Sequence, residues 1–274
     1  MEFPRISIVT PSYNQGKYLE RTLLSVLDQG YPNLEYLVID GGSTDESVAI
    51  IKRYADRLSV WVSEPDRGQS HAINKGFQRC TGQILAWLNS DDYLMPEALK
   101  AVAEAYRVDP DAGAWVGGCL IVTEGQQEGW VLPGDVLDLK TLGEAWSDNF
   151  FGQPSCFFSA SAWETCGPLD EALHFSMDLD LWLKMLASYR FAHLPRVVSC
   201  ASSHPEAKTT AHRSESMAQS WMVLARHGFG QAVEREIAAF VGECDQQRAK
   251  LDRVRRNPVF KLWKSYHRLK GGLS

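Results

Sequence analysis

Two adjacent carboxylates, Asp91 and Asp92, follow the apolar run Ile84–Leu88. Neighbouring carboxylates repel one another unless a cation or hydrogen-bond donors lie beside them. Hard divalent cations such as Mg²⁺ and Mn²⁺ take oxygen ligands of this kind. If the run is a strand of a parallel sheet, the pair lies at the edge where open α/β proteins bind ligands, and we expect a metal-assisted phosphate site there. The alternative is an Asp pair that only caps a helix starting near Pro96.

The first hundred residues alternate between strand-like and helix-like segments. Apolar, β-branched runs at 6–10, 34–39, 58–62 and 84–88 predict strands, and segments with helical apolar spacing at 18–29, 44–54 and 70–80 separate them. Such alternation implies βαβ units, so we predict an α/β fold with a mainly parallel central sheet flanked by helices. The middle of the chain, about 111–203, is less regular, and from 215 to about 256 the pattern is helical.

Four polar loops follow the predicted strands, at residues 11–15, 40–43, 64–68 and 89–92. Loops that leave the carboxyl ends of parallel strands share one edge of the sheet, so we expect these four to converge. Neither GxGxxG nor GxxxxGK[ST] occurs, which disfavours a dinucleotide fold or a P-loop. Asp45 begins the second predicted helix and is interpreted as a structural cap.

Composition is that of an ordinary globular protein, with 274 residues and a net charge of −6 that argues against nucleic-acid binding. Nine basic residues and one acidic residue lie between Arg248 and Lys270, so the rest of the chain carries −14. The six cysteines show no CxxC pair or zinc spacing and are expected to be reduced. No secretory signal or membrane-spanning run is apparent, so we expect a cytoplasmic protein.

The basic tail has an amphipathic pattern that favours a surface location. Apolar side chains recur at helical spacing (Val259, Leu262, Trp263, Tyr266 and Leu269), and lysines and arginines occupy mostly other faces. A helix of this kind binds anionic lipid, so we expect peripheral association with the inner face of the cell membrane. The alternative is a helix that packs on the body of the protein or on a second chain.

Three motifs in order resemble the inverting family 2 glycosyltransferases, which have the GT-A fold. They are Ile8–Asn14 (IVTPSYN), Val38–Asp45 (VIDGGSTD) and Asn89–Asp92 (NSDD). The stretch Glu64–Gly76 (EPDRGQSHAINKG) is similar to the subgroup that builds bacterial surface polysaccharides. The resemblance covers about residues 4–205 and implies a nucleotide-sugar donor, with uracil the commonest base.

The resemblance also implies roles for residues in these motifs. Pro11 and Tyr13 would border the base and ribose, and Asp40 would accept a hydrogen bond from the base, since a carboxylate presents only acceptors. Asp66 and Arg67 would lie near the donor, although Arg67 could equally be a solvated loop charge. Asp91 would face the ribose and the metal, and Asp92 would ligate the metal. The cofactor is Mg²⁺ or Mn²⁺, which neutralises the charge that develops on the nucleoside diphosphate leaving group.

An inverting transfer needs a base for the acceptor hydroxyl. The family usually has Glu-Asp at the start of a helix, the second acid being the base, whereas this chain has Met177-Asp178. Asp178 occupies the base position, and Asp180 is a candidate for assisting it. At a helix N-terminus either acid could instead stabilise the helix dipole.

A later segment, His204–Thr209, resembles a His-x-x-x-Lys-Thr element of the same subgroup. His204 would be a further metal or diphosphate ligand, and Lys208 would meet phosphate as a point charge.

These observations predict an enzyme that moves a sugar from a nucleotide-diphosphate sugar to a hydroxyl of a glycan or polyprenyl-diphosphate-linked glycan. We expect a transferase domain at 1–214, with a nucleotide-sugar half at about 4–95 and an acceptor half at about 96–205, and a helical extension at 215–274. One alternative is a nucleotidyltransferase, which would normally need a basic, Gly-rich loop after the first strand. The other is a non-catalytic module that binds nucleotide-sugar or glycan, which the absence of an acid at Met177 leaves open.

Overall fold

A computed structural model describes residues 3–126, 128–135, 138–146 and 151–256, the side chains of 254–256 excepted. The chain forms two compact units, Met1–His227 and a second that begins at Gly228. The predicted domain boundary at 214 falls inside a helix of the first unit. The basic amphipathic segment expected after Pro258 lies outside the described residues.

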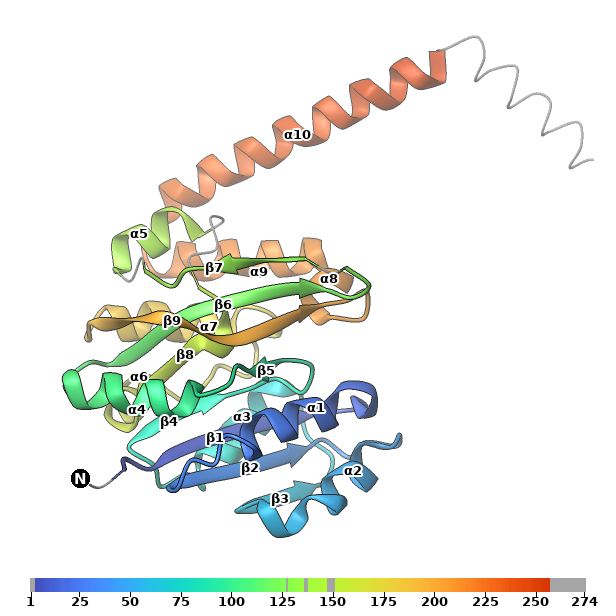
Figure 1. The fold of residues 1–274 in the computed structure, drawn as a ribbon. Coiled ribbons are helices and arrows are strands. Elements are labelled where there is room, and N and C mark those ends of the chain that lie inside the picture. The colour runs from blue at the N-terminus through green and yellow to red at the C-terminus, as the bar shows by residue number, and fades with distance from the viewer. Residues whose placement is uncertain (1–2, 127, 136–137, 147–150, 257–274) are drawn as a thin grey trace, which may run out of the picture. The chain divides into compact units, whose positions relative to one another are not determined.

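The N-terminal half of the first unit alternates strands and helices as the sequence pattern predicts (Figure 1). Its elements in chain order are β1 (Ile6–Ser12), α1 (Gly16–Leu27), β2 (Leu34–Asp40), α2 (Ser47–Arg53), a 3-10 turn at Ala55–Arg57, β3 (Val60–Ser63), α3 (Gln69–Phe77) and β4 (Ile84–Trp87). β3, β2, β1 and β4 are neighbours in that order and all run parallel. The apolar residues of β1 and β2 are buried, except for the partly buried Leu34 at the start of β2, as expected for strands covered on both faces.

The second half of this unit continues the same sheet with mixed strand directions. Its elements are β5 (Tyr93–Leu94), α4 (Ala98–Val108), β6 (Ala114–Thr123), β7 (Gly129–Leu132), α5 (Leu139–Glu144), a 3-10 turn at Gln153–Ser155, β8 (Cys156–Ser159), α6 (Ala160–Cys166), α7 (Met177–Leu186), β9 (Phe191–Ser203), α8 (Lys208–Ala211) and α9 (Arg213–Arg226). The described residues form one nine-stranded sheet in the order β3-β2-β1-β4-β8-β6-β9-β5, with β7 on β6. β8 is antiparallel to both β4 and β6, and β9 is parallel to β6.

A chain of aromatic rings joins the two halves of this unit. Trp87 at the end of β4 stacks on Trp182 of α7, with ring centroids 5.4 Å apart and an interplanar angle of 14°. Phe158 of β8 packs against both rings. All three side chains are buried, so α7 is held firmly against the carboxyl end of β4.

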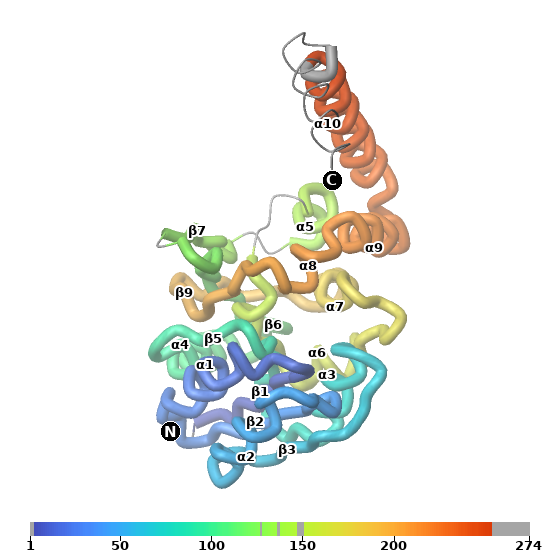
Figure 2. Tube along the Cα trace, turned by 90° about the vertical axis from the view of Figure 1, so that its right-hand side faces the viewer, coloured from blue at the N-terminus to red at the C-terminus, as the bar shows by residue number. Residues whose placement is uncertain are grey.

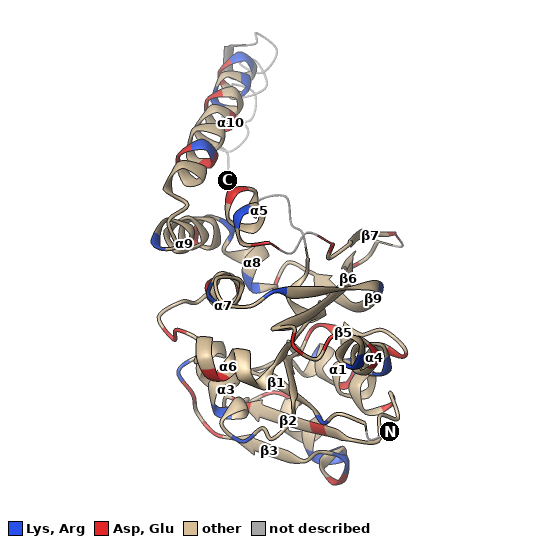
Figure 3. Cartoon of the chain, turned by 90° about the vertical axis from the view of Figure 1, so that its left-hand side faces the viewer, with Lys and Arg blue, Asp and Glu red and all other residues tan. Residues whose placement is uncertain are grey.

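The second unit contains α10 (Gly230–Arg256), a 27-residue helix that carries both acidic and basic residues (Figure 3). Among the described residues, no helix is both long enough and apolar enough to cross a membrane.

Candidate active site

The four predicted loops converge on one pocket at the carboxyl edge of the sheet. Its volume is about 810 Å³, and each loop contributes to its lining. The second wall comes from the Gln153 turn, the start of α7 and the segment after β9. Seven of the predicted site residues line it: Pro11, Tyr13, Asp66, Asp91, Asp92, Asp178 and Lys208.

Helix α1 holds the Asp91-Asp92 loop in place. Thr22 donates to the carbonyl oxygens of Ser90 (2.9 Å) and Asp92 (2.6 Å). Arg21 donates to the carbonyl oxygen of Asp91 at 2.8 Å and to Ser202 Oγ at 2.8 Å. The loop is followed by β5 before α4 begins at Ala98. The Asp pair therefore does not cap α4.

The Asp92 carboxylate is buried and only 5% exposed. Its Oδ1 accepts from Ser202 N at 3.0 Å, and its Oδ2 accepts from Asn89 Nδ2 at 3.2 Å. Burial, together with the charge of Asp91, raises the pKa of Asp92 to about 8. The hydrogen bonds to Asp92 and the positive charge of Arg21 lower the pKa of Asp92 but offset this rise only in part.

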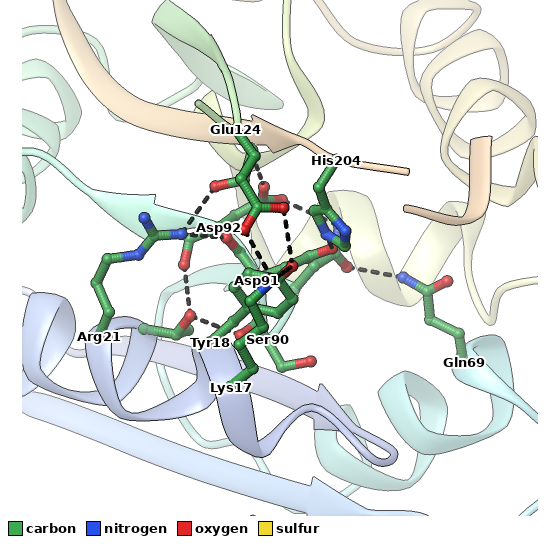
Figure 4. Close-up of polar contacts among 12 residues, drawn as sticks. Lys17, Tyr18, Arg21, Gln69, Ser90, Asp91, Asp92, Glu124 and His204 are labelled. Carbon is green, nitrogen blue, oxygen red and sulfur yellow. Dashed lines mark hydrogen bonds and ion pairs between the residues drawn. The ribbon is translucent and has the colours of Figure 1, made fainter. Parts of the chain in front are cut away.

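His204 lies against Asp91, with Nε2 3.1 Å from Asp91 Oδ2 (Figure 4). The ring of Tyr18 packs on the imidazole with centroids 4.5 Å apart, and His204 is buried. Its Nδ1 has no hydrogen-bond partner among the described residues. The structure thus brings His204 to the acid pair although 113 residues separate it from Asp91.

The arrangement of Asp91 and Asp92 suits a divalent cation that is shared with a substrate diphosphate. No three His, Cys, Asp or Glu side chains of the described residues come together as a ready-made metal cluster. A cation shared with a substrate diphosphate needs only one or two protein carboxylates, however. Asp91 and Asp92 fit that requirement, because both line the pocket and a cation beside them would offset their mutual repulsion.

Asp40 occupies a different position from the one its predicted role suggests. It is fully buried behind the pocket wall and does not line the pocket. Its carboxylate accepts from the backbone N of Gly42 (3.1 Å) and Ser43 (2.9 Å), and from the hydroxyls of Ser43 (2.5 Å) and Ser63 (2.7 Å). In this structure Asp40 therefore shapes the 41–43 loop.

Arg67 is exposed and does not line the pocket. Its guanidinium donates to Glu171 at 2.9 Å and 2.6 Å, which ties the loop after β3 to the segment before α7. Asp45 was predicted to cap the second helix, but α2 begins at Ser47 and its N-cap residue is Glu46. The Asp45 carboxylate accepts from the backbone N of Ser47 and of Gly16, so it joins the starts of α1 and α2.

Asp178 enters the pocket from the first turn of α7. The carboxylate is half-buried, and its Oδ1 accepts from Leu179 N at 2.8 Å. Burial raises the pKa of Asp178 to about 6. A carboxylate with a raised pKa at a pocket wall is suited to accept a proton near neutral pH.

Lys208 lines the same pocket, and its Nζ lies 3.3 Å from Gln69 Oε1.

Asp180 does not reach the pocket. It is 7% exposed and lies between His227 Nε2 at 2.8 Å and Lys184 Nζ at 2.6 Å. Burial alone would raise the pKa of Asp180, but these two partners lower it overall. Side chains two positions apart on a helix point in nearly opposite directions, so Asp180 faces away from the wall that Asp178 occupies.

Three amide side chains of the pocket form a hydrogen-bonded chain, and one of them, Gln69, was given no role from the sequence. Asn89 Nδ2 donates to Gln153 Oε1 at 3.1 Å, and Gln69 Nε2 donates to Asn89 Oδ1 at 2.7 Å. Isolated amides of this kind carry no spacing signal. Three lining residues also have a buried polar atom without a partner among the described residues: Ser12 Oγ, Gln15 Oε1 and Trp87 Nε1. Such atoms favour a polar ligand that completes their hydrogen bonds.

The sign of the pocket's charge restricts what it can bind. Five acids line it (Asp66, Asp91, Asp92, Asp178 and Glu206), whereas Lys208 is the one lysine or arginine among its described lining residues. A diphosphate would be repelled by this surface unless a cation accompanied it.

A sequence model of Glycosyl transferase family 2 matches residues 7–157, more than half of the chain. The chain belongs to this family. It is 29% identical over 199 residues to a chondroitin synthase of Escherichia coli, which covers 71% of this chain and 28% of that protein. This chain spans only 28%, 41% and 50% of the lengths of the first three curated relatives.

Solved structures support the expected GT-A fold of this family 2 chain. Residues 1–349 of TarS from S. aureus in complex with UDP-GlcNAc superpose with a TM-score of 0.60 at 17% identity, covering 80% of this chain and 65% of that one. Mannosyltransferase PcManGT from Pyrobaculum calidifontis, in complex with GDP-Man and Mn²⁺, gives 0.62 at 19% identity and covers 97% and 84%. At these identities the likeness concerns the fold.

Proposed function

We propose that this family 2 chain transfers a sugar from a nucleotide-diphosphate sugar to a hydroxyl of a glycan or lipid-linked glycan, with inversion at the anomeric carbon. The observation that carries the proposal is that the acid pair Asp91-Asp92 and the separate acid Asp178 line one pocket. Asp91 and Asp92 would hold a metal ion that neutralises the leaving diphosphate, and Asp178 would accept the proton of the attacking hydroxyl.

The chemical step uses this chain's own groups as follows. Asp178 accepts the proton of the acceptor hydroxyl as its oxygen bonds to the anomeric carbon, and the bond from that carbon to the diphosphate oxygen breaks. The nucleoside diphosphate leaves with the bonding electron pair. Asp91 and Asp92, with His204 beside Asp91, would hold Mg²⁺ or Mn²⁺, which supplies positive charge to the diphosphate. Lys208 would supply a second, weaker positive charge.

The donor side of the pocket supports a nucleotide. The Tyr13 ring is 62% exposed at the pocket lining, which leaves a face on which a base can stack. Pro11 and Asp66 lie beside it in the lining, and the unpartnered Ser12 Oγ and Gln15 Oε1 are close in sequence. We propose a UDP-sugar as donor, as in TarS in complex with UDP-GlcNAc, and GDP-sugars, as in PcManGT in complex with GDP-Man, are the alternative that the test includes.

Release of nucleoside diphosphate from a panel of nucleotide-sugars tests the proposal. With Mn²⁺ and a glycan acceptor present, we expect release of UDP from at least one UDP-sugar, and loss of release when EDTA removes the metal. Pyrophosphate formed from a nucleoside triphosphate and sugar phosphate would instead indicate a nucleotidyltransferase. Donor binding with no turnover on any acceptor would indicate a binding module and would contradict the proposal.

A further inference from the structure

Helix α9 contacts the start of α7, the helix that carries Asp178. Ser176 is the N-cap residue of α7, and its side chain makes no capping hydrogen bond to the first turn of the helix. Gln219 of α9 holds the backbone just before the helix: its Oε1 accepts from Phe175 N at 2.6 Å and from Ser176 N at 3.1 Å. One side chain thus fixes two successive amides, those of the residues three and two positions before Asp178.

A hydroxyl pair beside Gln219 adds a third bond. Ser220 Oγ donates to the carbonyl oxygen of Ser216 at 3.1 Å, so its hydrogen is engaged within α9. The 2.9 Å contact between Ser176 Oγ and Ser220 Oγ is therefore a bond that Ser176 donates. Ser176 is 2% exposed, which shields this bond from water.

A second contact between the two helices lies at the C-terminal end of α9. His227, directly after α9, lies 2.8 Å from Asp180, and Lys184 lies 2.6 Å from the other oxygen of that carboxylate. Because the lowered pKa keeps Asp180 ionised at neutral pH, its oxygen accepts and His227 Nε2 donates. The two helices lie beside one another (Figure 2), and Gln219 and His227 meet α7 in the order in which they occur along α9.

We propose that α9 is a positioning element of the transfer site, with Gln219 the positioning residue that sets where the Asp178 carboxylate lies. This inference rests on the proposed role of Asp178 as base. The family match ends at residue 157, so neither Asp178 nor α9 falls within it. A general base must lie within about 3 Å of the hydroxyl that it deprotonates, so a small shift of the α7 N-terminus costs rate rather than donor affinity.

Two substitutions of Gln219 separate positioning from general stability. Gln219→Met keeps the length of the side chain but removes the acceptor, and we expect kcat to fall by about tenfold or more with the donor KM within about twofold of wild type. Gln219→Glu keeps an acceptor for both amides, and we expect it to retain most of kcat at high pH. Its added charge should move the acid limb of the kcat profile to higher pH, because a nearby anion disfavours ionisation of Asp178.

Other groups near Asp178 stay unchanged in this experiment. Among the described residues, Lys208 of α8 and the Cys156 thiol of β8 interact electrostatically with Asp178, and His174 and Glu206 line the same pocket. Gln247→Met, at an exposed position of α10, is the matched control and should leave kcat as in wild type. The concentration of folded sites is measured by titration with UDP and Mn²⁺, so that partial unfolding of a variant does not count as lost kcat.

The outcomes distinguish this inference from the proposed function. Wild-type kcat in Gln219→Met, or equal loss of kcat in Gln219→Met and Gln219→Glu, would overturn the positioning role. If Asp178→Asn itself turns over like wild type, the base assignment fails, and the positioning inference fails with it. Loss of turnover in Asp178→Asn together with unchanged kcat in Gln219→Met refutes the positioning inference alone.

Discussion

At the scale of single residues, Asp178 has the environment that a proton acceptor needs. Its carboxylate lines the pocket while burial raises its pKa to about 6, whereas Asp180, two positions later, is turned away and paired with His227 and Lys184. The sequence pattern identified both acids as candidates. It placed Asp178 in the base position and Asp180 as a candidate for assisting it, but it did not predict that Asp180 faces away from the pocket, because one partner of Asp180 is a histidine 47 residues further along the chain.

The raised pKa of Asp178 leads to a prediction about pH. Transfer should rise with pH up to about 6 and level off above it, because only the ionised carboxylate accepts the proton. The folded state binds this proton more tightly than the unfolded chain, so folding stability falls as pH rises from about 4 to about 6. Asp178→Asn removes that loss and should raise the free energy of unfolding at pH 7 by about 1–3 kcal/mol, with little change at pH 4.

Kinetic pH profiles and urea unfolding at the two pH values check this prediction. A variant less stable than wild type at pH 7 would show that the ionised carboxylate is stabilised by its surroundings, contrary to the argument from burial.

At the scale of elements, the N-terminal βαβ units follow from the sequence because their apolar spacing is local. The second half could not be predicted in this way. The insertion of β8 between β4 and β6, and the pairing of β9 with β6, depend on contacts between segments far apart in the chain. For the same reason, Arg21 was not predicted as a site residue, since its partners Asp91 and Ser202 are brought to it only by the tertiary fold.

The packing of α3 on β1 gives a prediction at this scale. Gly76 lies in α3 where an added Cβ would come within 2.4 Å of Val9 Cγ1. Alanine normally stabilises a helix interior relative to glycine by about 1 kcal/mol. Here we expect Gly76→Ala to lower the free energy of unfolding by about 1–3 kcal/mol, because the buried Val9 cannot move without disturbing the sheet.

Urea unfolding measures the effect, and Gly242→Ala on α10, where nothing lies within 4 Å of the added carbon, is the control. In a Val9→Ala background the penalty at Gly76 should largely disappear. Stabilisation by Gly76→Ala in the wild-type background would contradict the tight packing of α3 on β1.

At the scale of the whole molecule, the pocket lining has the same sign of charge as the chain, which carries a net charge of −6. Five carboxylates and one lysine among its described lining residues form a surface that attracts cations and repels a free diphosphate. Net charge and composition excluded nucleic acid as an expected partner but did not locate this surface. The location follows from the fold, which brings four loops and α7 to one edge of the sheet.

The most direct test of the central claim is calorimetric titration of UDP and GDP into the protein with Mn²⁺ or with EDTA. For the wild-type chain, we expect one of the two nucleotides to bind about tenfold or more tightly with Mn²⁺, which corresponds to about 1.4 kcal/mol or more. Asp92→Ala should lose that metal-dependent gain, whereas Asp178→Asn should keep it. Equal affinity of wild type with Mn²⁺ and EDTA, or an undiminished gain in Asp92→Ala, would contradict the account.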